Sequence, residues 1–361
     1  MQLERLRFPL VACAILALLL AMWAGVIRLG WNFPPLIASL PSNHGALMVS
    51  GFLGILISIE RVVALGQRWM FAAPIFSALG VLAILVDAPM LLAPALMVLA
   101  SVALVAIYAV IVRRHVALYT ITMLVGSLLW LIGNLLWLGD LPIYRIVFWW
   151  GSFLVLTIVG ERLELGRLLQ LPGWTHALFL GAVIVLLAGL VVSLVDANIG
   201  NRIAGVGMVT LALWLARFDI ARRTVRQSGL TRFIASCMLS GYAWLGVSGI
   251  LAISFGQITG GYSYDAVLHT LFLGFVFAMI FGHAPIILPS VLQVPIKFQT
   301  VFYAHLILLH ASLALRIIGD LLSMTELRQW GGMLNVIALL VFVFNTMRVL
   351  RASTRKHASP I

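Results

Sequence analysis

The sequence predicts an all-α protein that crosses a membrane twelve times. The chain of 361 residues is 63% apolar and only 9% charged, whereas a typical soluble chain is about 45–50% apolar and about 25% charged. Apolar runs of about 17–25 residues, long enough to cross a bilayer as helices, recur with short polar breaks. No linker is long enough to hold a soluble domain, so we expect residues 1–361 to form a single transmembrane domain.

The predicted spans begin close to the N-terminus. The first apolar run, Phe8–Ile27, is about 20 residues long, so we interpret it as a membrane helix and not as a cleavable signal. The tail 351–361 is polar and is expected to fray. The predicted spans are 8–30, 43–65, 70–87, 90–112, 117–138, 143–162, 174–195, 201–218, 231–255, 263–290, 298–319 and 329–350.

The net charge of +12 predicts how the chain lies in the membrane. If the N-terminus is cytoplasmic, 18 of the 23 Lys and Arg residues fall on the cytoplasmic side, and the 11 acidic residues divide into 5 inside and 6 outside. Cytoplasmic loops of membrane proteins are enriched in Lys and Arg. We therefore predict that both termini are cytoplasmic, and we attribute the positive charge to topology and not to a nucleic-acid partner.

A weak repeat predicts three related units of four helices. In three of the spans, a Gly-Phe or Ser-Phe step is followed after seven residues by a pair that begins with an ionisable residue. The pairs are Gly51-Phe52 with Glu60-Arg61, Ser152-Phe153 with Glu161-Arg162, and Gly274-Phe275 with His283-Ala284. These spans are four apart and run in the same direction, which predicts pseudo-repeats of about 1–115, 116–230 and 231–350.

Two of the eight histidines are candidate haem ligands. His44 opens the span 43–65 at the outer face, and His269 lies about two turns into the span 263–290 from the same face. Two imidazoles on different helices can bind haem iron as axial ligands and give a six-coordinate, low-spin haem. The alternatives are an interfacial histidine and a hydrogen-bonded core histidine. Three histidines in predicted cytoplasmic segments are expected to be solvated: His115, His176 and His357.

A second group of histidines is expected in the last spans. His269 and His283 share a helix face but stand about 21 Å apart, too far for one metal ion. His283 and His305 are expected at a similar depth near the inner face, and His310 lies further along the same span as His305. This group has two interpretations: a second metal site, for example for copper, or a polar patch or proton relay.

Arginines near the predicted outer helix ends are candidate partners of a cofactor. Arg28 and Arg316 could hold haem propionates through charge-assisted hydrogen bonds, or they could be interfacial arginines that extend toward the headgroups. At the inner helix ends, Glu60-Arg61 and Glu161-Arg162 are interpreted as local ion pairs, with proton uptake as the alternative.

The residues around these histidines carry recognisable motifs, namely Asn43-His44-Gly45, Gly51-Phe52, Leu268-His269, Gly274-Phe275, Gly282-His283, Leu288-Pro289 and Leu315-Arg316. They resemble the haem–copper oxidase subunit I superfamily, and more closely the NnrS-type membrane proteins. The resemblance implies a haem b protein of the bacterial inner (cytoplasmic) membrane, linked with nitric oxide. It also implies His44 and His269 as axial ligands and copper as a further cofactor.

The sequence departs from the oxidase pattern at the copper centre. That centre needs histidines on the sixth and seventh spans, but 143–162 has none and His176 falls at the cytoplasmic end of 174–195. Val267 stands where oxidases carry the first histidine of a His-x-His motif, and Ala46 stands where NnrS-type proteins commonly carry a second histidine. An oxidase-type haem–copper centre, with oxygen reduction and proton pumping, is therefore not expected.

These observations lead to three hypotheses of function. The first is a haem-binding membrane protein that acts in nitric-oxide or respiratory stress handling or in electron transfer, with lipid, haem and a small diatomic molecule as partners. The second is a proton-coupled transporter with a relay through the second histidine group and helix breaks at Pro285 and Pro289. The third is a non-catalytic accessory subunit of a respiratory complex. No phosphate loop or Ser/His/Asp set is present, so no catalytic residue is assigned.

Overall fold

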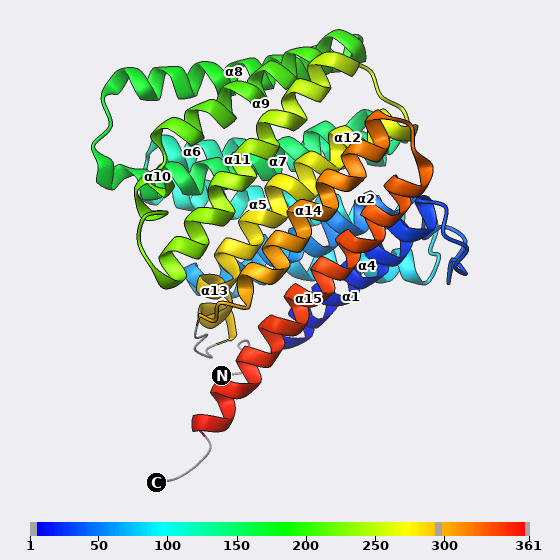
Figure 1. Cartoon of the computed structure of the whole chain (residues 1–361), viewed down its shortest axis with the longest axis horizontal. Helices are drawn as coiled ribbons and strands as arrows, with labels where there is room; N and C mark the ends of the chain where they lie inside the picture. The colour runs from blue at the N-terminus through cyan, green and yellow to red at the C-terminus, as the bar shows by residue number, and fades with distance from the viewer. Residues whose placement is uncertain (1–5, 293–297, 358–361) are drawn as a thin grey trace. The chain divides into compact units, whose positions relative to one another are not determined.

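The protein is an all-α, multi-pass membrane protein, as predicted. The computed structural model describes residues 6–292 and 298–357, and the regular elements in these ranges are all helical (Figure 1). Twelve helical segments in this part of the chain are long and apolar enough to cross a membrane. The helices form two compact units, which are described separately: unit 1 is Met1–Gly160 with Ser290–Gln293, and unit 2 is Glu161–Pro289 with Val294–Ile361.

Unit 1 holds the first five spans and most of the sixth. Its second span combines three pieces, because the helix widens into a π-helix, η2, between α2 and α3. The elements are α1 (Arg7–Arg28), α2 (His44–Ala46), η2 (Leu47–Leu53), α3 (Gly54–Leu65), η3 (Arg68–Phe71), α4 (Ala72–Leu85), α5 (Leu92–Arg114), α6 (Leu118–Leu138) and α7 (Ile143–Gly166), whose last turns belong to unit 2.

Unit 2 holds the remaining spans. The tenth span of the chain, which lies in this unit, also contains a π-helix, η5. The last helix continues to His357, so the predicted tail is helical up to that residue. Residues 358–361 of that tail lie outside the described residues. The elements are η4 (Arg167–Leu169), α8 (Gly173–Val195), α9 (Ala197–Phe218), α10 (Ala221–Thr224), α11 (Gly229–Phe255), α12 (Gly261–His269), η5 (Thr270–Phe277), α13 (Ala278–Leu292), α14 (Phe302–Leu321) and α15 (Thr325–His357).

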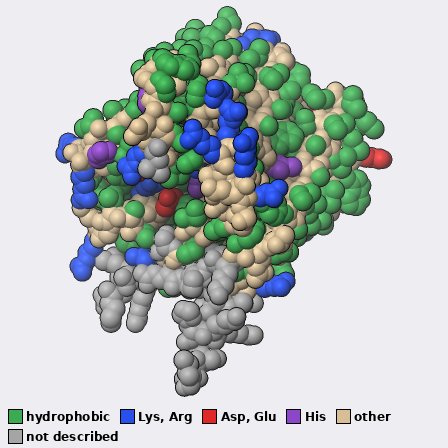
Figure 2. All heavy atoms as spheres, turned by 60° about the vertical axis from the view of Figure 1, so that its left-hand side comes forward, with side chains coloured by type: hydrophobic (Ala, Val, Ile, Leu, Met, Phe, Trp, Pro, Cys, Tyr) green, Lys and Arg blue, Asp and Glu red, His purple; other side chains and the backbone are tan. Residues whose placement is uncertain are grey.

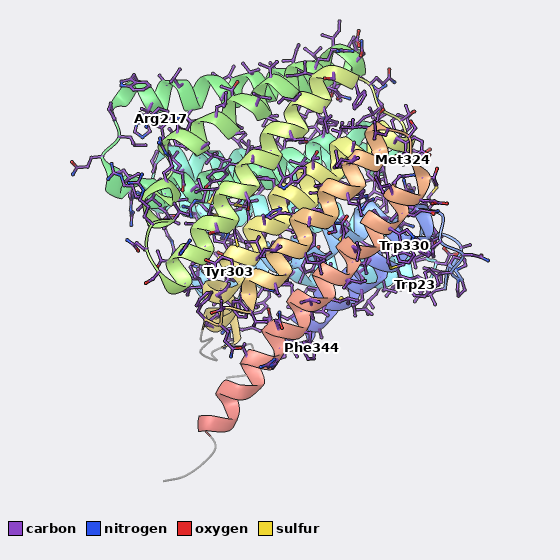
Figure 3. All side chains as sticks on the ribbon, viewed as in Figure 1. Trp23, Arg217, Tyr303, Met324, Trp330 and Phe344 are labelled. Carbon is purple, nitrogen blue, oxygen red and sulfur yellow. The ribbon has the colours of Figure 1, made fainter. Side chains whose placement is uncertain are left out.

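Apolar side chains cover the outside of the helices. Leu213 on α9 and Phe344 on α15 are each 66% exposed, and Figure 3 shows the Phe344 side chain on the outer face of α15. In Figure 2 the hydrophobic side chains spread over much of the visible face, while Lys and Arg gather in groups. Exposed apolar surface of this extent suits a lipid environment. A helix can cross such an environment because its backbone N–H and C=O groups are hydrogen-bonded to one another.

Small residues bring the helices of unit 2 close together. On α8, Gly189 lies against the backbone of Ala204 on α9, and Gly200 on α9 lies against Ser193 on α8. Because the hydrophobic effect does not drive helices together inside a bilayer, membrane helices gain stability from such close packing. The pair α8–α9 is therefore held by surface shape and van der Waals contact.

A buried polar network holds unit 1 together beside η2. Asn134 on α6 accepts hydrogen bonds at Oδ1 from Trp150 Nε1 at 3.0 Å and from Ser50 Oγ at 3.2 Å. Ser50 in turn accepts from Trp130 Nε1 at 3.0 Å, and its backbone carbonyl accepts from the Ser77 hydroxyl. All five residues are fully buried, so each polar atom takes its partner from another helix.

The two π-helices occur at the Gly-Phe steps of two of the three predicted repeats. Gly51-Phe52 lies in η2 and Gly274-Phe275 lies in η5, whereas Ser152-Phe153 lies in the regular helix α7. The carbonyl of Val267, next to η5, accepts a hydrogen bond from Ser248 Oγ on α11 at 3.0 Å. In both units, then, a serine of a neighbouring helix supplies a donor where the helical pattern is interrupted.

The expected helix breaks at Pro285 and Pro289 do not occur. Both prolines lie inside α13, which runs unbroken from Ala278 to Leu292. A proline removes one helical hydrogen bond, but a membrane helix tolerates it when neighbouring groups take over the freed carbonyl. The irregular part of this span lies earlier, in η5.

Close packing between α8 and α9 makes a direct prediction. A methyl group on Gly189 would collide with the backbone of Ala204, whereas one on Gly181, on the same helix, would meet no atom within 4 Å. We expect Gly189→Ala to destabilise the protein by about 1–3 kcal/mol through overpacking, and Gly181→Ala to leave stability unchanged or slightly raised. Thermal unfolding of both variants in detergent measures this difference, and equal midpoints would contradict it.

Candidate functional site

A buried cluster of charged side chains surrounds His269 in unit 2. The imidazole Nδ1 at the end of α12 lies 2.9 Å from the backbone oxygen of Asp265, one turn earlier, and 3.2 Å from its carboxylate Oδ1. Arg316 on α14 makes a bidentate ion pair with the same carboxylate, with two N–O distances of 2.7 Å. Asp265 is 6% and Arg316 5% exposed, so solvent screens this pair little.

Two further residues balance the charge of the cluster. Arg328 on α15 places Nε 3.4 Å from Asp265 Oδ2 and 3.1 Å from Asp320 Oδ1. Asp320 is itself only 4% exposed. Two carboxyl groups and two guanidinium groups therefore share one buried region, in which each carboxyl group lies within 3.4 Å of a guanidinium nitrogen.

The hydrogen bonds around His269 assign the tautomer of its ring. Because Nδ1 faces a carbonyl oxygen, it carries the hydrogen and donates it. Nε2 then has the lone pair and accepts from Arg316 Nη2 at 3.3 Å. The nitrogen that would ligate a metal is thus in contact with a guanidinium group.

His44 in unit 1 is also held by a backbone carbonyl at Nδ1, but this carbonyl belongs to a neighbouring helix. Its Nδ1 lies 2.7 Å from the backbone oxygen of Ala21 on α1, which makes Nε2 the lone-pair nitrogen. The ring lies over Gly25, where a methyl group would come within 3.0 Å of His44 Cε1. The absence of a side chain at Gly25 is what leaves room for the imidazole beside α1.

Each of these two histidines lies within three residues of the start of a π-helix. η2 begins three residues after His44, and η5 begins at the residue after His269. π-helical turns are rare in proteins, and many of those that occur lie at functional sites. There they displace side chains from the regular helical register. The sequence motifs flanking the two histidines therefore coincide with local backbone irregularities in both units.

Each of the two histidines has the local hydrogen bonding that is common in metal-ligating histidines. A metal-ligating histidine normally donates its other ring N–H to a backbone carbonyl or carboxylate, and both rings do so. The predicted propionate partners differ from each other. Arg28 is exposed and donates from Nη1 to the Pro41 carbonyl at 3.3 Å, whereas Arg316 is buried and already paired with Asp265.

The second histidine group does not converge on one point. His310 uses both ring nitrogens, because Nδ1 accepts from Trp244 Nε1 at 2.9 Å and Nε2 lies 2.8 Å from Ser240 Oγ. His283 holds Nδ1 on the carbonyl of Met279 at 2.8 Å. Among the described residues, no three His, Cys, Asp or Glu side chains are grouped so that they could hold a metal ion.

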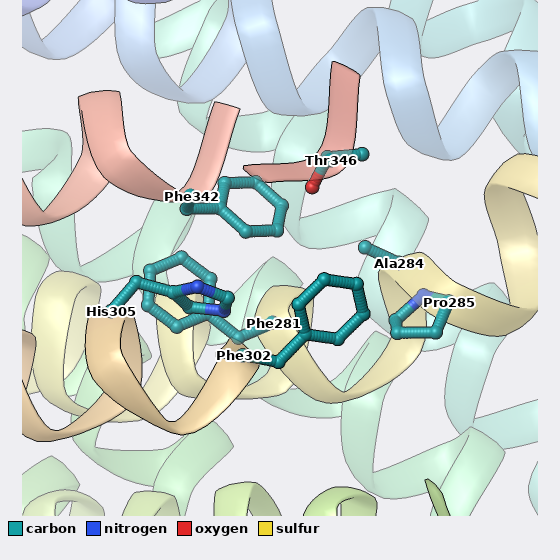
Figure 4. A pocket seen from close by; sticks show the side chains of 7 residues that line it. All are labelled: Phe281, Ala284, Pro285, Phe302, His305, Phe342 and Thr346. Carbon is teal, nitrogen blue, oxygen red and sulfur yellow. The ribbon is translucent and has the colours of Figure 1, made fainter. Parts of the chain in front are cut away.

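His305, the third member, lies in an aromatic cage of unit 2. Its ring centroid is 4.7 Å from that of Phe281, 5.4 Å from that of Phe342 and 5.7 Å from that of Phe302. The residue is 1% exposed and lines a small pocket (Figure 4). His305 and His310 therefore have separate surroundings.

Ion pairs near the expected inner helix ends agree only in part with the prediction. Arg61 pairs with Glu60 at 3.3 Å, as expected. Arg162, by contrast, makes a bidentate pair with Asp219, with N–O distances of 2.9 and 2.8 Å. Asp219 follows α9, 57 residues along the chain, so a pairing based on sequence adjacency did not find it.

Three members of the His269 cluster were missed from the sequence, namely Asp265, Asp320 and Arg328. Asp265 precedes His269 by four residues, a spacing that places both on one helix face, and this signal was present in the sequence. Asp320 and Arg328 lie near helix ends, where charged residues are common, so nothing in the sequence distinguishes them.

Comparison with known proteins places the chain in a family. The family model described as a domain of unknown function, DUF8744, matches residues 7–351, which include all twelve spans and both histidine sites. No curated protein matches the chain.

The charge balance around Asp265 can be tested by an isosteric change. Asp265→Asn keeps the shape but removes a negative charge, which leaves Arg316 and Arg328 undercompensated. Breaking a buried pair costs about 3–5 kcal/mol, so the midpoint of thermal unfolding should fall clearly. Asp140→Asn, at an exposed position, is the matched control and should have little effect. Equal midpoints for the two variants would show that the buried pair contributes nothing.

Proposed function

We propose that this chain, which belongs to the family DUF8744, is a haem-binding integral membrane protein that acts in nitric-oxide handling or electron transfer. One observation supports the proposal above the others. His44 and His269 each hold Nδ1 on a backbone carbonyl, so that Nε2 carries the lone pair, and each precedes a π-helix. We assign these two nitrogens as the iron ligands of haem b.

In this proposal the protein side chains position the ligands and balance charge. The haem supplies one-electron redox chemistry and the capacity to bind small diatomic molecules. Asp265 orients His269 through its backbone carbonyl and its carboxylate. Arg316 has to leave His269 Nε2, to which it lies 3.3 Å away, and a propionate is a suitable new partner for its guanidinium. Arg28 is the corresponding propionate partner in unit 1.

The haem proposal predicts a coloured protein whose spectrum depends on both histidines. Protein purified from haem-replete cells should show the Soret band of a low-spin haem, with haem and iron content confirmed by pyridine haemochrome and metal analysis. His44→Ala and His269→Ala should each shift the band or lower haem content several-fold, because each removes an iron ligand. His115→Ala, at an exposed position, is the control and should keep the spectrum. A colourless wild-type protein would falsify the proposal.

A second prediction changes the position of His44 without touching its imidazole. Gly25→Val places branched carbon atoms where a methyl group alone would lie 3.0 Å from His44 Cε1. We expect the ring to be displaced and haem content or the Soret maximum to change. Gly181→Val, at an open position, is the control. An unchanged spectrum in folded Gly25→Val protein would argue against His44 as a ligand.

A proton-coupled transporter is the second candidate function, and the charged cluster in unit 2 favours it. Ionisable residues inside membrane spans often mark ion and substrate paths, and Asp265, Arg316 and Asp320 are all buried. Proteoliposomes with an internal pH dye test this directly. Proton flux that is lost in Asp320→Asn, measured on a colourless protein, would replace the haem proposal with this one.

A further inference from the structure

A small pocket in unit 2 encloses the imidazole of His305. It lies among α13, α14 and α15, and three phenylalanines, Phe281, Phe302 and Phe342, form much of its wall. Two polar side chains, His305 and Thr346, complete it, and Figure 4 shows both pointing into the pocket. These side chains are at most 8% exposed, so the pocket is an interior feature of the unit.

One ring nitrogen of His305 has no hydrogen-bond partner in the described part of the chain. Nδ1 lies 3.5 Å from Asn345 Nδ2, an amide that can only donate. Nδ1 is therefore the acceptor and Nε2 carries the hydrogen. Nε2 is buried and has no hydrogen-bond partner, and the phenylalanine rings around it offer at most a weak N–H···π contact. A buried donor in this position requires an acceptor that the side chains do not provide.

The backbone beside the pocket has a carbonyl group without its helical N–H donor. Pro285 lies inside α13 and has no N–H, so the carbonyl of Phe281, four residues earlier, loses its helical donor. Phe281 and Pro285 both line the pocket. The Thr346 hydroxyl, which both donates and accepts, is a third polar group there. The pocket thus holds one unpartnered donor and one hydroxyl group, and it lies beside the helical turn whose carbonyl has lost its donor.

The size of the pocket decides what can occupy it. Its cavity volume, for the centres of water-sized spheres, is about 10 Å³, and one buried water needs roughly 10–15 Å³ by this measure. A quinone ring or an acyl chain is too large. A metal ion would need more ligands, and no group of three His, Cys, Asp or Glu exists among the described residues.

We propose that this pocket is a binding site for one water molecule. The water accepts the hydrogen of His305 Nε2, donates to the Phe281 carbonyl and shares a hydrogen bond with the Thr346 hydroxyl. With these contacts it connects α13, α14 and α15 at the turn where Pro285 interrupts the helical bonding. It also hydrates an imidazole that lies inside a membrane span. The site is independent of the proposed haem ligands.

A map of the wild-type protein at about 2 Å resolution tests the proposal. We expect an isolated density peak within hydrogen-bond distance of His305 Nε2, as for any ordered water. Thr346→Val, which keeps the side-chain shape, should lose or weaken the peak. Thr210→Val, at an exposed threonine on α9, should keep it. A protein atom against Nε2, an empty pocket, or elongated density of a larger ligand would each overturn the proposal.

Unfolding of a set of variants gives a second, independent readout. His305→Phe and Thr346→Val each remove a partner of the water, so the double variant should unfold at nearly the temperature of the less stable single variant. His305→Phe combined with Thr210→Val should instead show additive shifts, because distant and unconnected sites add. Additive shifts for His305 and Thr346 would count against a shared water. If a variant does not fold, the wild-type map decides alone.

Discussion

Polar groups buried among apolar side chains and lipid have to find their partners within the protein, and this constraint shapes both units. Helices satisfy most of the backbone. Where the helix is irregular, side chains of neighbouring helices donate hydrogen bonds to its backbone carbonyls. Ser77 donates to the carbonyl of Ser50 beside η2, and Ser248 donates to the carbonyl of Val267 beside η5. The same constraint explains why an unpartnered His305 nitrogen points to a bound molecule.

Charged side chains follow this rule in a stronger form. The bidentate pairs Arg316–Asp265 and Arg162–Asp219 are both almost completely buried, and each places a guanidinium fork on a carboxylate, the geometry in which arginine is most effective. In the first pair, Asp265 also orients His269. Stability and the proposed ligand chemistry therefore depend on the same carboxylate, so a change there affects both.

The parts that sequence reasoning predicted well are those set by composition and short-range periodicity. The twelve spans follow from the length of apolar runs. The histidines stood out as candidates because ionisable residues are rare in such runs, and their role as ligands stays a prediction. The pairing of Arg162 was predicted wrongly, since Glu161 is adjacent in sequence but Asp219, 57 residues away, forms the bond. The helix breaks expected at Pro285 and Pro289 were also wrong, because α13 runs through both prolines and the irregular part of this span is η5.

Hydrophobicity along the chain was enough to establish a polytopic helical protein, because a bilayer accepts little else. It also drew attention to the histidines inside the spans, His44 and His269 among them. The orientation of each imidazole, the carbonyl that holds its Nδ1 and the guanidinium beside His269 Nε2 required the folded units. Those contacts join residues up to 47 positions apart, and no local pattern encodes which distant side chain a folded helix will meet.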